Sequence, residues 1–521
     1  MENKFNLDEG IIKYFYKPKN KSAENEDSEV AEYQRLSISE LLNQASDAAD
    51  NNDYKKAKKL WEAASKYDDD HACYCLGICY LEGKDVEIDY YKAFEYFVKS
   101  ANKGNMHAEF YLALCYEYGL GIDINYDLAF EWCQKSAEQD YMFAQYRLAY
   151  YYKLNTNLPF ADNKTFFWFN KAAEQNYIPA IYMLGECYLE GIGTNKNFEK
   201  AIELYEKASE NRYYPAICKL GECYENGICV QKDLNKAIEY YNLAVEGENE
   251  KAQYNLALIY DNGIGVLQDF NKAVELYKLS AENGYPPAQN AYGWCFVVGK
   301  VVKQDLYQAV RWFRSAAKQG NMRAQYNLAI CYEEGKGLVQ DTEKAFYWHS
   351  KAAEQGDDRA QLHLGWAYMV GNGVDIDGKE ALKWLFKSAE KGNSQAMTDI
   401  GYCYANGIGT KKNKQEGFKW YLKSAEKNNN MAIYNVACCY RHGTGIKKDS
   451  AKSVEWYAKG AELGNTDCML SLAFMYEHGK GVKKDLGQAV EWYTKAAQYG
   501  QDDAQIMLER KKINKYLNKN L

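Results

Sequence analysis

A 36-residue repeat runs through most of this 521-residue sequence and restricts its fold more than any other feature. Small residues recur at this interval without an insertion, and we use them as the anchors of the repeats. The anchors are Ala72, Ala108, Ala144, Ala180, Ala216, Ala252, Ala288, Ala324, Ala360, Ala396, Ala432, Cys468 and Ala504. A fixed period of roughly 20 to 50 residues is typical of proteins that stack one small unit many times. The sequence therefore predicts a repeat array and not a set of separate globular domains.

Each repeat opens with a segment whose spacing predicts an amphipathic helix, which we name helix A. Counting from the anchor, a large apolar residue stands at offset 4, Gly or Ala at offset 5 and an aromatic residue at offset 8, as in Leu76, Gly77 and Tyr80. These positions share one face of an α-helix. A glycine at offset 11, such as Gly83, predicts the end of helix A because glycine readily adopts the left-handed backbone conformation.

A second segment in each repeat predicts another helix, which we name helix B. Asp or Asn stands at offset 17 in eleven repeats, for example Asp89, and predicts the N-cap of this helix. An aromatic residue follows at offset 24, and eight of the eleven tryptophans occupy this one position. The repeat that begins at Ala144 departs most from the pattern, with Pro159 in its turn and Ala161 at the cap position. We expect a distorted turn in that repeat.

Two helices per repeat predict an all-α fold, a right-handed α/α superhelical solenoid of antiparallel helix pairs with a 36-residue period. Ser37 and Glu40 have the spacing of a capping box, which indicates a further helix pair before the first anchor. The predicted organisation is an N-terminal extension at 1–35, largely disordered, a degenerate capping repeat at 36–71, twelve repeats at 72–503 and a C-terminal capping helix at 504–521.

At these positions the sequence resembles the Sel-1-like repeat, a relative of the tetratricopeptide repeat. The pattern A-x3-L-G-x2-Y-x2-G-x-G, then D-x2-K-A, then W-Y-x-K-A-A-x2-G, occurs with small departures over residues 360–392. The resemblance implies a non-enzymatic scaffold or adaptor that binds protein partners, and in some relatives a bacterial protein that acts in host cells. It also implies one alternative, because hydrolysis of β-lactams has been ascribed to some cysteine-rich relatives.

Charge and hydrophobicity narrow the classes of partner. The 64 basic and 72 acidic residues give a net charge of −8, which is the wrong sign for binding a phosphate backbone, so we expect no nucleic-acid partner. No apolar run approaches the roughly 20 residues that span a bilayer, so we expect no direct membrane insertion. The first residues lack the apolar run of a secretory signal, so we expect no signal peptide. A cytoplasmic location is the expectation, and export as an effector is its alternative.

Helix A is expected to line the inner face of the solenoid, as the tetratricopeptide resemblance implies. Offset 2 carries aromatic rings and offset 3 carries amides, both suited to binding a peptide. The candidate binding residues are Tyr74, Phe110, Tyr146, Tyr182, Tyr254, Asn255, Tyr326, Asn327, Tyr434 and Asn435. Acidic residues at offsets 9 and 10, such as Glu225 and Glu477, favour an extended or helical partner peptide with basic and apolar residues. The alternatives are that the rings pack on the preceding repeat and that the acids form a solvated rim.

Cysteine and histidine are the residue types that could carry chemistry. Eight of the fifteen cysteines share offset 7, and equivalent residues of adjacent repeats stand about 10 Å apart, beyond disulfide reach. We interpret them as small buried fillers with reduced thiols. His71, Cys75 and His107 have a register that would suit a metal site or a Cys–His nucleophile, but no CxxC or HExxH motif accompanies them. We therefore expect no catalytic residue, no metal and no cofactor.

Overall fold

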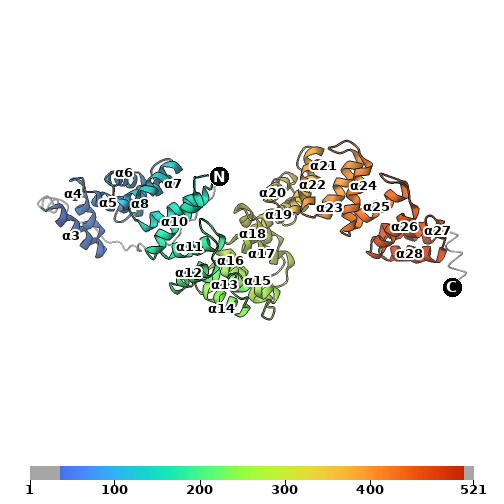
Figure 1. Cartoon of the computed structure of the whole chain (residues 1–521), viewed down its shortest axis with the longest axis horizontal. Coiled ribbons are helices and arrows are strands. Elements are labelled where there is room, and N and C mark those ends of the chain that lie inside the picture. Colours follow the sequence, from blue (N-terminus) through green and yellow to red (C-terminus); the bar gives the residue numbers. More distant parts are fainter. Residues whose placement is uncertain (1–35, 510–521) are drawn as a thin grey trace. The chain divides into compact units, whose positions relative to one another are not determined.

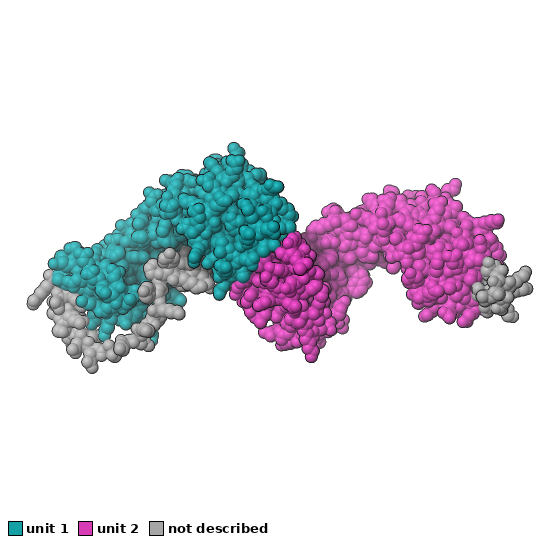
Figure 2. Space-filling model, turned by 90° about the horizontal axis from the view of Figure 1, so that it is seen from below, with its two compact units in different colours: residues 1–249 teal, residues 250–521 magenta. Residues whose placement is uncertain are grey.

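The computed structural model describes residues 36–509, which form paired helices and contain no strand. Figure 1 shows helix following helix along the chain, with short turns between them. Two compact units are distinguished by their internal contacts, residues 1–249 and residues 250–521, and both are coloured in Figure 2. The predicted all-α fold of helix pairs with a 36-residue period is confirmed. The predictions for 1–35 and for 510–521 lie outside the described residues.

Unit 1 contains the predicted N-terminal helix pair and the first five repeats. Its helices are α3 (Ile38–Asp50), α4 (Tyr54–Ser65), α5 (Asp70–Glu82), α6 (Tyr90–Ala101), α7 (Met106–Tyr118), α8 (Tyr126–Glu138), α9 (Met142–Leu154), α10 (Ala161–Glu174), α11 (Ile178–Glu190), α12 (Phe198–Glu210), α13 (Tyr214–Asn226) and α14 (Leu234–Glu246). From α5 onward, odd-numbered helices are helix A of a repeat and even-numbered helices are helix B.

Unit 2 contains the seven remaining repeats and a short terminal helix. Its helices are α15 (Glu250–Asn262), α16 (Phe270–Glu282), α17 (Pro286–Val298), α18 (Leu306–Lys318), α19 (Met322–Glu334), α20 (Thr342–Glu354), α21 (Asp358–Val370), α22 (Gly378–Glu390), α23 (Ser394–Asn406), α24 (Lys414–Glu426), α25 (Asn430–His442), α26 (Ser450–Glu462), α27 (Thr466–His478), α28 (Leu486–Gln498) and α29 (Asp502–Leu508).

Most of the described helices begin at a side-chain cap. The Asp89 carboxylate accepts a hydrogen bond from the Lys92 backbone N–H at 3.0 Å, and the offset-17 residue caps helix B in the same way elsewhere. The capping box at Ser37 and Glu40 is also present. Helix A has a cap of its own three residues before the anchor, which we did not predict. The residues that make it are Asp69, Asn105, Asn321, Asp357, Asn393, Asn429 and Asn465.

Glycines end helix A and hold the turn against the preceding repeat. Gly83 has a φ of 70°, and its N–H donates a hydrogen bond to the Cys79 carbonyl, as predicted for offset 11. At offset 13, the second glycine of the turn, glycine is required for a different reason. A Cβ on Gly121 would lie 2.2 Å from the Tyr90 carbonyl oxygen of the preceding repeat. The turn of one repeat therefore rests directly on the start of the preceding helix B.

The repeat that begins at Ala144 has the distorted turn expected from its sequence. Helix α9 ends at Asn155, whose φ of −108° is outside the left-handed region found at the glycines. Helix α10 follows Phe160, which has no side-chain cap and a φ of 57°. The loss of both the glycine and the N-cap residue accounts for the change.

Each repeat is held together where helix B packs on helix A. The residue at offset 25 is buried in all twelve repeats, and it lies against the offset-5 residue in the six repeats where that residue is glycine. In the first repeat, a Cβ on Gly77 would lie 2.5 Å from the Phe97 ring. The offset-25 residues are Phe97, Cys133, Phe169, Tyr205, Tyr241, Tyr277, Phe313, His349, Leu385, Tyr421, Tyr457 and Tyr493.

The cysteines belong to this core. All fifteen are free, and of those at offset 7 only Cys295 is not fully buried. Burial raises the pKa of Cys115 to about 12, so its thiol stays protonated and unreactive at neutral pH. The interpretation of the offset-7 cysteines as small fillers is confirmed.

Candidate functional site

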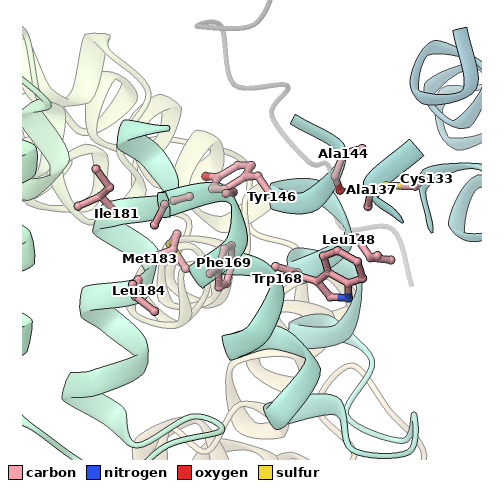
Figure 3. Close-up of a cluster of buried hydrophobic side chains, with 14 of the residues drawn as sticks. Cys133, Ala137, Ala144, Tyr146, Leu148, Trp168, Phe169, Ile181, Met183 and Leu184 are labelled. Atoms are coloured by element: carbon pink, nitrogen blue, oxygen red, sulfur yellow. Dashed lines mark hydrogen bonds between the residues drawn. The ribbon is translucent and has the colours of Figure 1, made fainter. Parts of the chain in front are cut away.

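Two of the predicted binding residues lie inside the stack of repeats. Phe110 is 2% exposed and Tyr146 is 6% exposed. Figure 3 shows Tyr146 in a cluster with Phe169 and Met183, and the centroids of the Tyr146 and Phe169 rings are 5.6 Å apart. Neither side chain is available to a partner in this structure. The prediction that Phe110 and Tyr146 line a binding face is therefore corrected to a packing role.

The other candidate rings, Tyr74, Tyr182, Tyr254, Tyr326 and Tyr434, are partly exposed. They also contact the following repeat. The ring centroids of Tyr182 and Tyr213 are 5.6 Å apart, and those of Tyr254 and Tyr285 are 5.5 Å apart. These contacts favour the packing alternative, with the following repeat as the observed neighbour. A role of these five tyrosines in binding stays a prediction.

The candidate amides Asn255, Asn327 and Asn435 are partly exposed as well. Asn327 donates a hydrogen bond through Nδ2 to Oδ1 of Asn290, which lies on the preceding helix A, at 2.9 Å. The amide of Asn327 therefore links neighbouring repeats. A peptide-binding role for the three amides stays a prediction.

The acidic residues at offset 9 point into the repeats, where their carboxylates accept hydrogen bonds. Glu225 accepts a hydrogen bond from the Tyr241 hydroxyl at 2.6 Å, and Glu477 accepts one from the Tyr493 hydroxyl at 3.0 Å. Both donors are offset-25 residues. Burial is the main cause that raises the pKa of the Tyr241 hydroxyl, so it remains a donor. These carboxylates are structural acceptors, which corrects their assignment to an open acidic face.

The repeat that begins at Ala324 has a histidine in place of the usual tyrosine or phenylalanine beside its offset-9 acid. Glu333 on α19, His349 on α20 and His363 on α21 bring their ligand atoms within 4.8 Å of one another, and we name them the His–His–Glu cluster. Oε2 of Glu333 lies 3.3 Å from Nε2 of His349 and 3.2 Å from Nδ1 of His363. The two imidazoles stack, with centroids 4.5 Å apart and planes 10° from parallel.

The electrostatics of the cluster centre on the carboxylate. Hydrogen bonds from His349 and His363 lower the pKa of Glu333 to about 2, so it is ionised at neutral pH. Burial lowers the pKa of His349 and favours its neutral form. Tyr326 packs edge-on against both rings, at centroid distances of 5.6 Å and 5.8 Å. The Arg359 guanidinium lies over Tyr326 and binds the Asp357 carboxylate at 2.9 Å.

Sequence reasoning missed this cluster although its residues occupy regular positions. Glu333 stands at offset 9, His349 at offset 25 and His363 at offset 3 of the next repeat. Arg147, also at offset 3, binds the offset-9 Glu117 of the preceding repeat through Nε at 3.1 Å. Comparing these three offsets together, and not one at a time, would have identified the cluster.

The group predicted from sequence near the N-terminus is only partly assembled. Sγ of Cys75 lies 3.6 Å from Nε2 of His71, as their four-residue spacing suggested. Burial raises the pKa of the Cys75 thiol to about 12, so this cysteine is not an activated nucleophile. The His107 ring instead packs tilted against Tyr74 and edge-on against Tyr141, at centroid distances of 5.5 Å and 4.6 Å.

Unit 2 exposes large apolar side chains on helix A that the sequence reasoning did not select. Trp294, Trp366 and Tyr402 all stand at offset 6, on α17, α21 and α23, and they are 53%, 43% and 49% exposed. Val298 and Val370, one turn further along α17 and α21, are exposed as well. We name these five residues the unit 2 apolar surface. Trp294 and Trp366 are two of the three tryptophans outside offset 24. This departure from the repeat pattern is the sequence feature from which their special position could have been inferred.

Comparison with known proteins gives the class of this chain. The family model described as Sel1 repeat matches twelve consecutive segments, at 70–105, 107–141, 143–177, 178–213, 215–249, 250–285, 286–321, 323–357, 358–393, 394–429, 430–465 and 466–500. The chain belongs to the Sel1 repeat family, which confirms the resemblance seen in the sequence. Repeats of this family generally mediate protein interactions.

One solved structure that is similar over most of this chain supports the fold, and two others are similar over parts of it. The chain is similar to c5321, described as a protective antigen of uropathogenic Escherichia coli with an SLR fold, at 28% identity and a TM-score of 0.54 over 87% of this chain and 98% of that one. A Sel1 repeat protein from Oxalobacter formigenes is 30% identical over 47% of this chain and 96% of its own, with a TM-score of 0.44. Cysteine rich protein B of Helicobacter pylori is 29% identical over 25% of this chain and 96% of its own, with a TM-score of 0.22. No curated protein matched the sequence.

Within residues 36–509, none of the helices has the length and apolar character needed to span a membrane.

Proposed function

We propose that this protein is a non-enzymatic interaction scaffold, and that it binds a partner protein on the unit 2 apolar surface. The observation that carries the proposal is the exposure of Trp294, Trp366 and Tyr402 at one position of helix A. Tryptophan and tyrosine supply much of the binding energy at protein interfaces, and contiguous exposed apolar residues mark interaction sites. Helices α17 and α19 are in direct contact, and the shared offset places Trp294, Trp366 and Tyr402 at equivalent points of α17, α21 and α23.

The partner is proposed to be an apolar protein segment with few charged contacts. The acidic residues near this surface already have partners: Glu333 binds the two histidines, and Glu334 binds Lys336 at 2.5 Å. A partner that depended on basic residues would have to compete with these contacts. Burying the rings of Trp294, Trp366 and Tyr402 offers the larger gain.

The absence of enzymatic activity and a cytoplasmic location are parts of the same proposal. Fifteen free cysteines suit a reducing compartment. The alternative of β-lactam hydrolysis requires an activated nucleophile, and the raised pKa of Cys75 argues against the Cys75–His71 pair. Turnover of a β-lactam by the purified protein, abolished by His71→Ala, would establish that alternative. Export of the protein as an effector is the alternative to a cytoplasmic location.

The binding surface is tested by affinity capture followed by mass spectrometry. The wild type is compared with a double variant, Trp294→Ala with Trp366→Ala. The matched control is Tyr307→Ala with Tyr347→Ala, because these two aromatic residues of unit 2 are more than half exposed but lie on helix B, in α18 and α20. Circular dichroism verifies that all three proteins keep their helical content.

We expect the tryptophan variant to lose partners that the wild type and the control retain. Truncating a central interface tryptophan costs about 2 kcal/mol or more, which weakens binding roughly 30-fold. Partners that persist with the tryptophan variant would place binding elsewhere. Loss in both variants would contradict the assignment to helix A.

A further inference from the structure

We propose that Glu333, His349 and His363 form a binding site for a divalent transition-metal ion of the zinc class. Two imidazole nitrogens and one carboxylate oxygen are ligands that Zn²⁺ takes in proteins, with a fourth position left for water or a further ligand. This site is separate from the proposed interaction function, and either proposal stands without the other.

The distances in the His–His–Glu cluster match the edges of a coordination tetrahedron. Zinc lies about 2.0–2.2 Å from nitrogen and oxygen ligands, so two ligand atoms on one ion are about 3.3–3.5 Å apart. The two measured separations from Oε2 of Glu333 are 3.3 Å and 3.2 Å. The ligand atoms all lie within 4.8 Å of one another, so the two histidine nitrogens have to approach each other by at most about 1.5 Å to reach the same spacing.

The repeat register explains why three helices converge on one point. The acid at offset 9 meets the buried side chain at offset 25 in several repeats, as in the Glu225–Tyr241 and Glu477–Tyr493 pairs. The offset-3 residue of the next repeat reaches the same acid, as the ion pair of Arg147 with Glu117 shows. The backbone therefore supplies the geometry at every repeat.

The chemistry differs from repeat to repeat because the side chains differ. In the repeat that begins at Ala324 the three positions read Glu, His and His. In the preceding repeat they read Val297, Phe313 and Asn327, and in the following one Met369, Leu385 and Asp399. The two neighbouring repeats thus lack the ligand set that this repeat has.

Packing alone does not account for His349. A tyrosine at offset 25 gives the offset-9 acid a hydrogen bond and leaves no other polar atom to satisfy, as in Tyr277 with Asp261 at 3.1 Å. His349 is 4% exposed, and its Nδ1 is buried without a hydrogen-bond partner. A buried polar atom in this state costs about 1–3 kcal/mol, so the histidine is a poorer structural choice than tyrosine here. Coordination through Nε2 leaves Nδ1 unpaired, so this cost is present with or without a metal; what histidine adds over tyrosine is a nitrogen ligand beside the Glu333 carboxylate.

An ion has a route to the site. The His349 side chain is buried, but those of His363 and Glu333 are 29% and 22% exposed. The Arg359 guanidinium, which lies over Tyr326 beside the cluster, is held by the Asp357 carboxylate. A cation can therefore approach from the Glu333 and His363 side without displacing the core.

The test uses the full-length protein, freed of metal with a chelator, and isothermal titration with ZnCl₂. Each variant introduces the residue that other repeats of this chain carry at the same offset. His349→Tyr matches Tyr241 and Tyr277 at offset 25, and His363→Asn matches Asn255 and Asn327 at offset 3. Both are expected to fold, which thermal unfolding verifies. The control is His478→Asn, an exposed histidine at the end of α27 outside the cluster.

We expect the wild type and His478→Asn to bind one equivalent of Zn²⁺ that both cluster variants lose, with affinity lower by roughly ten-fold or more. Co²⁺ in the same site gives visible absorption bands of a tetrahedral complex, which His349→Tyr abolishes. An equal isotherm for the wild type and His363→Asn would overturn the proposal, because the ion would then sit on other groups such as the thiols. No binding by the wild type would overturn it as well. If His349→Tyr fails to fold, Glu333→Gln takes its place in both measurements.

Discussion

At the scale of single residues, Arg212 holds a backbone conformation that the repeat usually gives to glycine. The position four residues before each anchor has a positive φ throughout the described repeats, for example 83° at Gly104 and 55° at Arg212. The Cβ of an L-residue is crowded in this region. The repeat that contains Arg212 therefore stores local strain that repeats with glycine at this position, such as the one with Gly104, avoid.

Arg212→Gly is expected to stabilise the protein by about 0.5–1 kcal/mol, the left-handed penalty less the added entropy of the unfolded glycine. The midpoint of thermal unfolding should rise. Arg212→Ala removes the same side chain but keeps a Cβ, so it should bring no comparable gain. An equal rise in both variants would show that the side chain, and not the backbone, is the cause.

The environment of Asp399 disfavours the ionised form of its carboxyl group. Asp399 lies at offset 3 of α23, where burial raises its pKa to about 6 despite a hydrogen bond from Gln395 at 3.0 Å. Because the pKa in the folded state is above the unfolded value of about 3.9, the folded protein holds this proton more tightly. The ionised carboxylate therefore destabilises the fold above pH 6, and protonation removes this effect as the pH falls toward 4.

Asp399→Asn should stabilise the protein at pH 7.5, by on the order of 1–3 kcal/mol, and the gain should vanish near pH 4. The measurement is denaturant unfolding of the wild type and the variant at both pH values. The difference between the two proteins isolates Asp399 from the other titrating groups. A gain of the same size at both pH values would contradict the assignment.

At the scale of elements, the turn between helix A and helix B depends on a close backbone contact. Gly121 and Gly104 have similar positive φ angles, 72° and 83°. They differ in surroundings: a Cβ at Gly121 would meet the Tyr90 carbonyl at 2.2 Å, whereas a Cβ at Gly104 would meet no atom within 4 Å. The two positions therefore separate the cost of conformation from the cost of a clash.

Gly121→Ala should destabilise the protein by about 3 kcal/mol or more, because the turn must move off the preceding helix B. Gly104→Ala should cost only about 1 kcal/mol, the conformational part. Thermal unfolding of both variants measures the contrast. Equal losses would mean that the Tyr90 contact does not restrict the turn.

The elements could be predicted from the sequence because their signals are local. Asp89 and Gly83 set a helix start and a helix end through their own backbone neighbours, so their spacing alone locates them. The Asn caps before helix A were just as local and were missed because they are interrupted by tyrosines such as Tyr141, which makes no side-chain cap.

The candidate site could not be predicted in the same way because it depends on contacts between helices. Glu333, His349 and His363 lie on three successive helices and meet only through the packing of one repeat on the next. The burial of Phe110 and Tyr146 depends on that packing too, since the same offset leaves Tyr254 partly exposed. The exposure of Trp294 required knowing which face of α17 has no neighbour.

At the scale of the whole molecule, the stability of stacked repeats is expected to be local. Each helix contacts mainly the next helix in the chain, so the folding energy is close to a sum over repeats and their interfaces. A defect in one repeat should therefore open its neighbours and leave distant repeats closed. This distinguishes the fold from a globular protein with a single core.

Phe313→Ala tests this expectation, because Phe313 is buried at offset 25 of α18. The change should cost about 3–5 kcal/mol and raise amide hydrogen exchange in α17–α20, while α5 and α6 keep the wild-type rates. Tyr307→Ala, an exposed change on the same helix, should leave exchange unaltered. A uniform increase along the described chain would contradict the local account.

The central claim is that the unit 2 apolar surface binds a partner protein, and hydroxyl-radical footprinting of the captured complex tests it most directly. Trp294, Trp366 and Tyr402 should be oxidised in the free protein and protected in the complex. Tyr307 and Tyr347 on helix B should be oxidised equally in both. Unchanged oxidation of the three helix A residues, with protection confined to helix B or to unit 1, would contradict the claim.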